Sequence, residues 1–135
     1  MSDAVTFVAE HPRSILVTRR RDGGLQASPV RVMVDANGAL VASTRAPTAK
    51  ARNLARDARF TLCSISDGWS GPWMTIEGTV EVLRLPEALD RLHDFFAMRD
   101  GGIANEEEFR ATMEREERVL LEFRVDRWTP LPAPR

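Results

Sequence analysis

The sequence predicts a mainly β, α+β fold in which six strands form a small antiparallel barrel with short helices inserted between them. Tight turns at 21–24 and 35–38 join the first three strands and are too short for the crossover that parallel strands need. Helical segments are inserted irregularly and do not alternate with the strands, which disfavours a parallel sheet. Gly78 interrupts a long strand, as glycine does where a barrel strand bends.

The amino-terminal part of the chain predicts one helix and three strands. Apolar residues at helical spacing indicate a short helix over 3–10. Runs of β-branched residues and a regular alternation predict strands over 14–19, 25–34 and 39–44. Asn37-Gly38 fits the turn between the last two strands, because both residues tolerate positive φ.

The middle of the chain predicts a helix over 47–55 and strands over 60–66 and 73–83. Pro47 suits the first position of a helix. Leu54 is the one large apolar residue of this helix, so we expect the helix to be only shallowly buried. Along the longer strand, apolar residues alternate with Thr and Glu, and its central glycine predicts a bulge.

The carboxy-terminal part predicts two helices and a sixth strand. Apolar residues recur at helical spacing within 86–98. Asn105 and Glu108 resemble a capping box, which opens a second helix. The final strand is expected over 119–125, and the tail from Trp128 is expected to be irregular.

The composition is that of a single globular domain spanning residues 1–135. A net charge of −1 gives no bias toward nucleic acid or membranes. The single cysteine, Cys63, excludes an intramolecular disulfide and a cysteine-built metal site. There is no signal-peptide pattern and no apolar stretch near the ~20 residues that span a bilayer, so we expect a cytoplasmic protein.

Charge is unevenly distributed along the chain. Residues 44–60 hold five cations against Asp57, a local charge of +4. Residues 106–122 hold seven glutamates against three arginines, a local charge of −4. An anionic ligand is therefore expected at the first of these regions.

The positive region contains Lys50, the one lysine of a chain whose other eighteen basic residues are arginine. It follows Ser43, Thr44 and Arg45 near the start of a predicted helix, where free N–H groups, hydroxyls and a cation form an anion site. Asn53, three residues further on, shares its helix face. We interpret the pair as phosphate ligands, and a solvated helix face is the alternative that the residues leave open.

Five short segments spread over nearly the whole chain occur in a recognisable order. They are Leu-Val-Thr…Asp-Gly…Gln-Ala-Ser-Pro-Val near the amino terminus, the run from Ser43 to Arg59, Asp67-Gly68-Trp69-Ser70, Glu77-Gly78-Thr79 and Arg118-Val-Leu-Leu. In this set the chain resembles the pyridoxamine 5′-phosphate oxidase-like FMN-binding split barrels, and most of all their actinobacterial branch that uses the deazaflavin coenzyme F420. The resemblance implies a split barrel that forms a homodimer, with a cofactor site at each subunit interface.

The resemblance also implies which residues hold the cofactor phosphate. Lys50 is expected to contact the phosphate, with Ser43, Thr44 and Asn53 nearby. The family often has arginine two residues before this lysine, and here that position is Thr48. Either Arg45 takes the place of the missing arginine or phosphate binding is weaker.

For the cofactor ring, the resemblance implies that the backbone of Ser28, Pro29 and Val30 lines it and that Trp69 packs near it. Proline donates no ladder hydrogen bond, so an edge or a bulge is expected at Pro29. An ordinary edge proline is the alternative. A large aromatic residue in a loop fits a flavin ring, a subunit interface or core packing, and the residues leave these open for Trp69.

No nucleophile–base pair and no metal site is evident, so no catalytic residue is assigned. In a flavin-type enzyme the cofactor carries the redox chemistry. The resemblance implies an F420-dependent oxidoreductase that passes a hydride to a small unsaturated or quinone-like acceptor. An FMN-dependent oxidase or reductase of the same fold, and a protein that carries the cofactor without turnover, are the alternatives.

Overall fold

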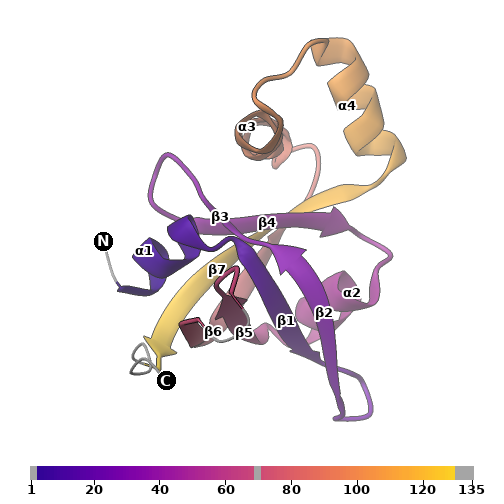
Figure 1. The fold of residues 1–135 in the computed structure, drawn as a ribbon. Helices are drawn as coiled ribbons and strands as arrows, with labels where there is room; N and C mark the ends of the chain where they lie inside the picture. The colour runs from indigo at the N-terminus through magenta and orange to yellow at the C-terminus, as the bar shows by residue number, and fades with distance from the viewer. Residues whose placement is uncertain (1–2, 69–70, 130–135) are drawn as a thin grey trace.

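The computed structural model describes residues 3–68 and 71–129, which form one seven-stranded sheet and four helices (Figure 1). The helices are α1 (Asp3–Glu10), α2 (Ala49–Arg56), α3 (Leu89–Asp100) and α4 (Glu106–Arg115). The strands are β1 (Arg13–Arg19), β2 (Leu25–Arg31), β3 (Met33–Val34), β4 (Leu40–Arg45), β5 (Arg59–Ile65), β6 (Trp73–Leu83) and β7 (Arg118–Trp128).

The sheet has the order β2-β1-β5-β6-β7-β4-β3, and all neighbouring strands are antiparallel. The strand predicted over 25–34 is broken at Val32, which gives seven strands where six were predicted. At the break, the N–H of Val32 donates to the carbonyl of Pro12 at 2.9 Å. Since β2 and β3 form opposite edges of the sheet, the sheet curls and the chain itself joins the two edges. The predicted antiparallel split barrel is confirmed.

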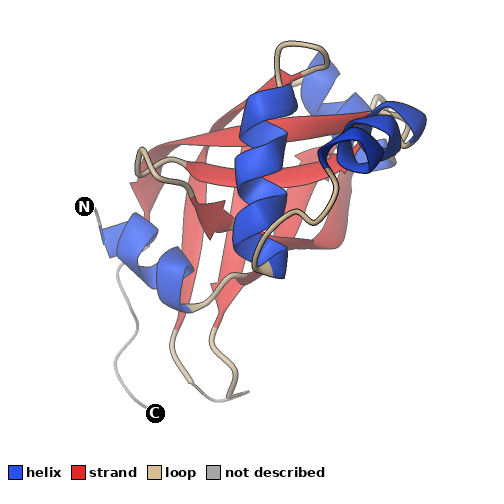
Figure 2. Cartoon of the chain, turned by 90° about the horizontal axis from the view of Figure 1, so that it is seen from above, coloured by secondary structure: helices blue, strands red, loops and turns tan. Residues whose placement is uncertain are grey.

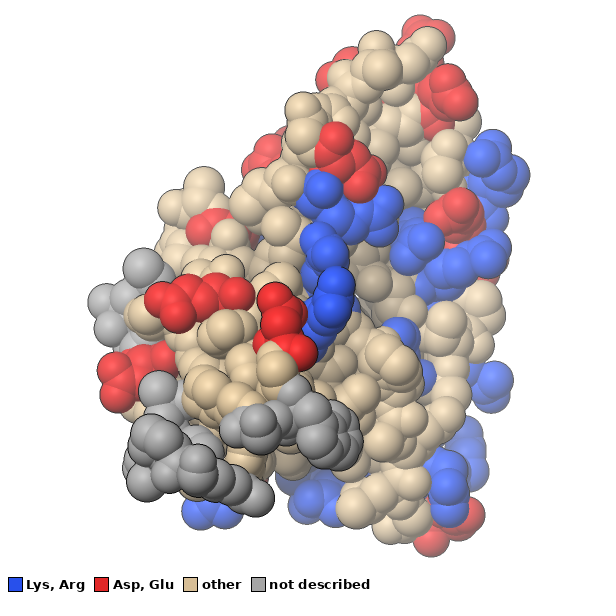
Figure 3. Space-filling model, viewed as in Figure 1, with Lys and Arg blue, Asp and Glu red and all other residues tan. Residues whose placement is uncertain are grey.

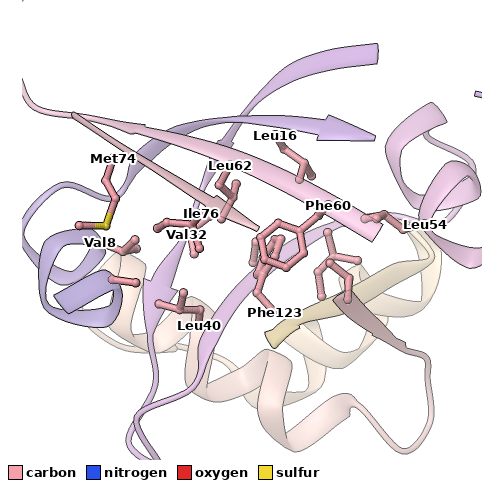
Figure 4. Close-up of a cluster of buried hydrophobic side chains, with 14 of the residues drawn as sticks. Val8, Leu16, Val32, Leu40, Leu54, Phe60, Leu62, Met74, Ile76 and Phe123 are labelled. Atoms are coloured by element: carbon pink, nitrogen blue, oxygen red, sulfur yellow. The ribbon is translucent and has the colours of Figure 1, made fainter. Parts of the chain in front are cut away.

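The interior of the barrel is a continuous apolar core (Figure 4). Leu16, Leu62 and Ile76, from three adjacent strands, are fully buried. The rings of Phe60 and Phe123 meet edge to face with centroids 4.9 Å apart. Side chains of α1 and α2 join this core from opposite sides, so each of these helices closes one end of the barrel.

Helices α3 and α4 lie outside the barrel, against the sheet (Figure 2). A second apolar cluster joins their side chains to those of β4 and β7. Val41 of β4 and Leu120 of β7 point outward into it and contact residues such as Leu92, Phe96 and Met113 of the two helices. Strands β4 and β7 are therefore covered on both faces. None of the helices in the described residues is long and apolar enough to cross a membrane.

The structure confirms the predicted start of α4 but moves the start of α2. The side chain of Asn105 accepts a hydrogen bond from the N–H of Glu108 at 2.9 Å, which confirms the predicted cap of α4. Helix α2 begins at Ala49 instead of Pro47, because Thr48 is its cap and accepts from the N–H of Ala51 at 3.4 Å. An N-cap residue has an extended backbone, so Pro47 lies just outside the helix.

The expected shallow burial of α2 is wrong. Leu54 is 2% exposed, and Ala51 and Asn53 are buried with it. A helix that closes the end of a barrel is surrounded by strand ends, so one large apolar side chain per two turns is enough to anchor it.

The expectation of an irregular chain at Trp128 is also wrong, because Trp128 pairs with Ile76 and ends β7.

The predicted bulge at Gly78 is confirmed as a register shift between Glu77 and Gly78 in the β6–β7 ladder. A Cβ atom on Gly78 would overlap the backbone carbonyl of Arg124 on β7. We therefore expect Gly78→Ala to lower the free energy of unfolding by about 1–3 kcal/mol, as overpacking does. Chemical denaturation measures this change.

The matched control is Gly68→Ala, because among the described residues a Cβ there meets nothing nearer than a backbone nitrogen at 3.9 Å. This control should change the free energy of unfolding by less than about 0.5 kcal/mol. Equal stabilities for the two variants would contradict the close approach of β6 and β7.

Candidate functional site

The end of β4 and the start of α2 bring together most of the predicted phosphate residues. The hydroxyls of Thr44 and Thr48 lie 3.1 Å apart, and Thr48 Oγ1 donates to the carbonyl of Arg45 at 2.8 Å. Ser43 Oγ donates to the carbonyl of Val119 on β7 at 3.0 Å. These hydroxyls are already engaged within the chain, so in this structure they shape the turn that leads into α2.

Lys50 stands on the first turn of α2 and its side chain is half-buried. Its Nζ donates to the carbonyl of Pro29 on β2 at 3.3 Å, so the structure places the predicted phosphate residue against the predicted ring-lining strand. Burial and, second, the positive charge of Arg118 lower the pKa of Lys50. No acidic group contributes to the environment of this ammonium in the described part of the chain.

Arg118 is a residue that sequence reasoning did not assign to the site. It opens β7 directly opposite Arg45 of β4, and its charge reaches Lys50. Its Nε donates to Glu116 Oε1 at 2.8 Å, and no other hydrogen bond of its guanidinium is seen in the described residues. The Arg118 segment was recognised as a motif, but only the pairing of β4 with β7 shows that it meets residues more than sixty positions earlier.

Arg45 itself is exposed, and its Nε donates to the carbonyl of Glu116 at 3.3 Å. Three cations, Arg45, Lys50 and Arg118, therefore border the junction of β4, α2 and β7. Figure 3 shows Lys and Arg atoms gathered in the middle and on the right of the face seen in Figure 1, the side on which β2 and α2 lie. This side of the molecule fits an anionic ligand.

Asn53 lies deeper than a surface ligand would. It is 6% exposed, and its Nδ2 donates to Thr18 Oγ1 at 3.1 Å and to Gln26 Oε1 at 3.2 Å. Arg56 Nη2 donates to Asn53 Oδ1 at 3.0 Å. These bonds tie α2 to β1 and β2 and so hold Lys50 in position. A contact between Asn53 and phosphate stays a prediction.

The expected edge position of Pro29 is confirmed, because β2 is an edge strand of the sheet. In an antiparallel edge strand, alternate backbone groups point away from the neighbouring strand. The carbonyl of Pro29 is one of these, since it accepts from Lys50. By the same alternation the backbone groups of the flanking Ser28 and Val30 face β1. That Ser28, Pro29 and Val30 line a planar ring stays a prediction.

The sequence of this chain is similar to that of a known protein family. A family model described as pyridoxamine 5′-phosphate oxidase matches residues 2–131. The chain belongs to the pyridoxamine 5′-phosphate oxidase family. Among curated proteins, no similar sequence was found.

Solved structures of similar fold have diverse descriptions. A conserved hypothetical protein, Rv2991 of Mycobacterium tuberculosis, is 25% identical with a TM-score of 0.74, covering 95% of this chain and 82% of that one. An F420 reductase is 18% identical with a TM-score of 0.70, covering 96% and 98%. The heme storage protein HutZ of Vibrio cholerae is 15% identical with a TM-score of 0.71, covering 94% and 91%.

The residues of this member of the pyridoxamine 5′-phosphate oxidase family fit a phosphate-bearing flavin. Lys50 and Arg118 are close enough for their like charges to interact, and Lys50 has no acidic partner in the part of the chain that the structure describes. A phosphate between them would relieve that repulsion. Within the same residues, no group of three or more His, Cys, Asp or Glu side chains could hold a metal ion. Trp69, the other predicted ring contact, lies outside the described residues.

Proposed function

We propose that this chain is a cytoplasmic F420-dependent oxidoreductase that reduces a small unsaturated or quinone-like acceptor. The observation that carries the proposal is Lys50, which lies against the edge strand β2 and whose ammonium is near the positive charge of Arg118. When bound, the deazaflavin would supply the hydride chemistry. The redox step therefore needs no catalytic triad from the protein.

The residues of the chain have three tasks in this proposal. Lys50 and Arg118 bind the phosphate through charge-assisted hydrogen bonds. Backbone groups at Ser28, Pro29 and Val30 line the ring along the β2 edge. The hydrogen bonds of Asn53 hold α2 on β1 and β2. The β2 edge and the phosphate-binding residues would hold the cofactor in a fixed place. This raises the rate of hydride transfer through proximity and orientation.

Two other functions have support from particular comparisons. Membership of the pyridoxamine 5′-phosphate oxidase family supports FMN as the cofactor of an oxidase or reductase. The similar fold of a heme storage protein supports a carrier that binds its ligand without turnover. The F420 reductase of similar fold and the local charge of +4 over residues 44–60 favour the anionic deazaflavin.

Separate titrations with F420 and with FMN, followed by cofactor fluorescence, test the proposal. Tight binding of F420 with weak binding of FMN is the expected result. The reverse order of affinities would replace F420 with FMN, and binding of neither would remove the cofactor assignment.

A second experiment separates an enzyme from a carrier. Reduced F420 is mixed with a panel of enones and quinones, and its oxidation is followed. An enzyme oxidises F420 repeatedly, whereas a carrier binds it stoichiometrically without turnover.

The affinity for F420 should depend on pH through Lys50. Only the charged ammonium attracts phosphate, and burial together with Arg118 holds the pKa of Lys50 below its usual value. Binding is therefore expected to weaken as pH rises, starting below the pH at which an ordinary lysine loses its proton. Titrations at a series of alkaline pH values measure this. Lys50→Arg keeps its charge over the range, so an equal loss in that variant would assign the effect to another group.

We further propose that the protein is a homodimer with its cofactor sites at the subunit interface. The outer face of β1 and β5 carries apolar side chains, Ile15, Val17, Cys63 and Ile65, which are half-buried. The helices α3 and α4 cover the outer face of β4 and β7 instead. An uncovered apolar sheet face next to β2 supports an interface with a second copy.

Ile15→Arg is expected to shift the dimer toward monomer by raising its dissociation constant more than about tenfold, because an unpaired charge at an apolar interface is costly to bury. Analytical ultracentrifugation over a dilution series measures this. Met98→Arg is the matched control, since Met98 is 41% exposed on α3, away from this face. Loss of the dimer in both variants, or in neither, would argue against the β1–β5 interface.

A further inference from the structure

A cavity lies between α3 and α4, and Arg118 at the start of β7 also lines it. Its volume is about 420 Å³, within the range of small-molecule sites. Phe96, Ile103, Phe109 and Met113 form an apolar wall, and Ile103 and Phe109 are only half-buried. The Phe96 and Phe109 rings meet at 6.0 Å with an interplanar angle of 64°. This wall can accept the flat apolar body of a ligand.

Two guanidinium groups approach the same aromatic ring at this cavity. The Cζ atoms of Arg99 and Arg118 lie 4.6 Å and 5.6 Å from the centroid of Phe96. Such contacts hold a cation in a fixed place on the ring. The cavity therefore has positively charged groups at defined positions beside its apolar wall.

Arg99 and Arg118 differ in how many of their N–H groups already donate hydrogen bonds within the described residues. Arg99 donates from Nε and Nη2 to both carboxylate oxygens of Asp100, at 2.8 Å and 3.2 Å. Arg118 donates to Glu116 from Nε alone, and the described residues give its terminal nitrogens no acceptor. Its side chain is 23% exposed, so most of the side chain is removed from water. A carboxylate matches such a pair of terminal N–H groups.

The acidic residues of the lining limit the charge of the ligand. Asp100 and Glu116 are each paired with an arginine at 2.8 Å, so each of these pairs carries no net charge, and Arg118 attracts a ligand through its terminal N–H groups, which have no acceptor among the described residues. Glu108 also lines the cavity, is exposed and has no described side-chain partner. Repulsion from Glu108 disfavours a second negative group on the ligand.

We propose that the cavity between α3 and α4 binds a small aromatic monocarboxylate, with its carboxylate on Arg118 and its ring against Phe96 and Phe109. This site goes beyond the cofactor function proposed above, because none of the residues that line it except Arg118 belongs to the cofactor site. The occupant is a free small molecule, since the donors and the apolar wall border the same cavity of about 420 Å³.

Binding of 2-naphthoate to the full chain, followed by calorimetry, tests this site, with neutral 2-naphthalenemethanol as the matched probe. Saturable 1:1 binding of the acid is expected, with the alcohol at least about tenfold weaker, as for loss of a charge-assisted hydrogen bond. No saturable binding of the acid, as when a second copy of the chain covers the cavity, would overturn the proposal. Equal binding of acid and alcohol would do the same.

Variants locate the bound acid. Arg118→Gln is expected to weaken naphthoate binding at least about tenfold, whereas Arg99→Gln, which removes the arginine already paired with Asp100, should change it far less. Ala104→Trp, at an exposed lining position, should block binding without disturbing the core. Undiminished binding in Arg118→Gln or Ala104→Trp would refute the assigned cavity.

One further variant keeps this proposal separate from the cofactor assignment. Lys50→Ala should leave naphthoate binding within about twofold, because Lys50 does not line the cavity. Loss of F420 binding with retained naphthoate binding would support both sites. Loss of naphthoate binding in Lys50→Ala would mean that the acid occupies the phosphate site, and the cavity proposal would fail.

Discussion

Lys50→Ala should weaken F420 binding by about 1.5–3 kcal/mol, the range for a hydrogen bond to a charged group, or about 10- to 150-fold in dissociation constant. Lys50 is half-buried beside Arg118 and has no acidic partner in the described residues, so its charge is available to a ligand. Its one described hydrogen bond, to the carbonyl of Pro29 at 3.3 Å, is long. The fold should therefore survive, and fluorescence titration of the folded variant gives the affinity.

Two further variants make this result specific. Arg52→Ala removes an exposed cation from the same helix and should change the affinity much less. Lys50→Arg should recover only part of the lost affinity, because a forked guanidinium does not replace a compact ammonium. An unchanged affinity in Lys50→Ala, or an equal loss in Arg52→Ala, would remove Lys50 from the phosphate site.

Leu54→Ala should lower the free energy of unfolding by about 2–5 kcal/mol, the range for removing a buried leucine side chain. Leu54 is 2% exposed and is the large apolar side chain with which α2 closes the barrel. The same helix carries Lys50, so a loosened α2 should also weaken F420 binding. Urea denaturation followed by circular dichroism measures the stability, and titration of the folded fraction measures the affinity.

The control for this variant is Met98→Ala, because Met98 is 41% exposed on α3. Its free energy of unfolding should change by less than about 0.5 kcal/mol. A stability loss in Leu54→Ala no larger than in Met98→Ala would mean that α2 does not seal the barrel. The shallow helix predicted from the sequence would then be the better description.

Local sequence signals predicted most of the barrel. Asn37-Gly38 marked the turn before β4, and Gly38 has the positive φ of 80° that this turn needs. Gly78 marked the bulge in β6 because glycine allows the close approach of another backbone. Pro29 marked an edge strand because it cannot donate to a ladder. Each of these signals acts within a few residues of its own position.

Features set by distant parts of the chain escaped the sequence reasoning. The alternating pattern continues through Val32, so nothing local showed that its N–H leaves the ladder for Pro12. The burial of Leu54 depends on the strand ends around it, which helical spacing does not reveal. In the candidate site, Lys50 was recognised from its own segment, but its neighbour Arg118 appears only when β7 pairs with β4.

The place of β7 in the sheet bears on how the protein is made. β7 is synthesised after all the other described strands, yet it lies between β6 and β4. A nascent chain that ends before Arg118 can form the hairpins of β1 with β2 and of β3 with β4, but β4 still lacks β7 on its other side. Pairing across such sequence separations is slow. Lys50 and Arg118 meet only once β7 has left the ribosome, so an unfinished chain has no complete site to capture cofactor.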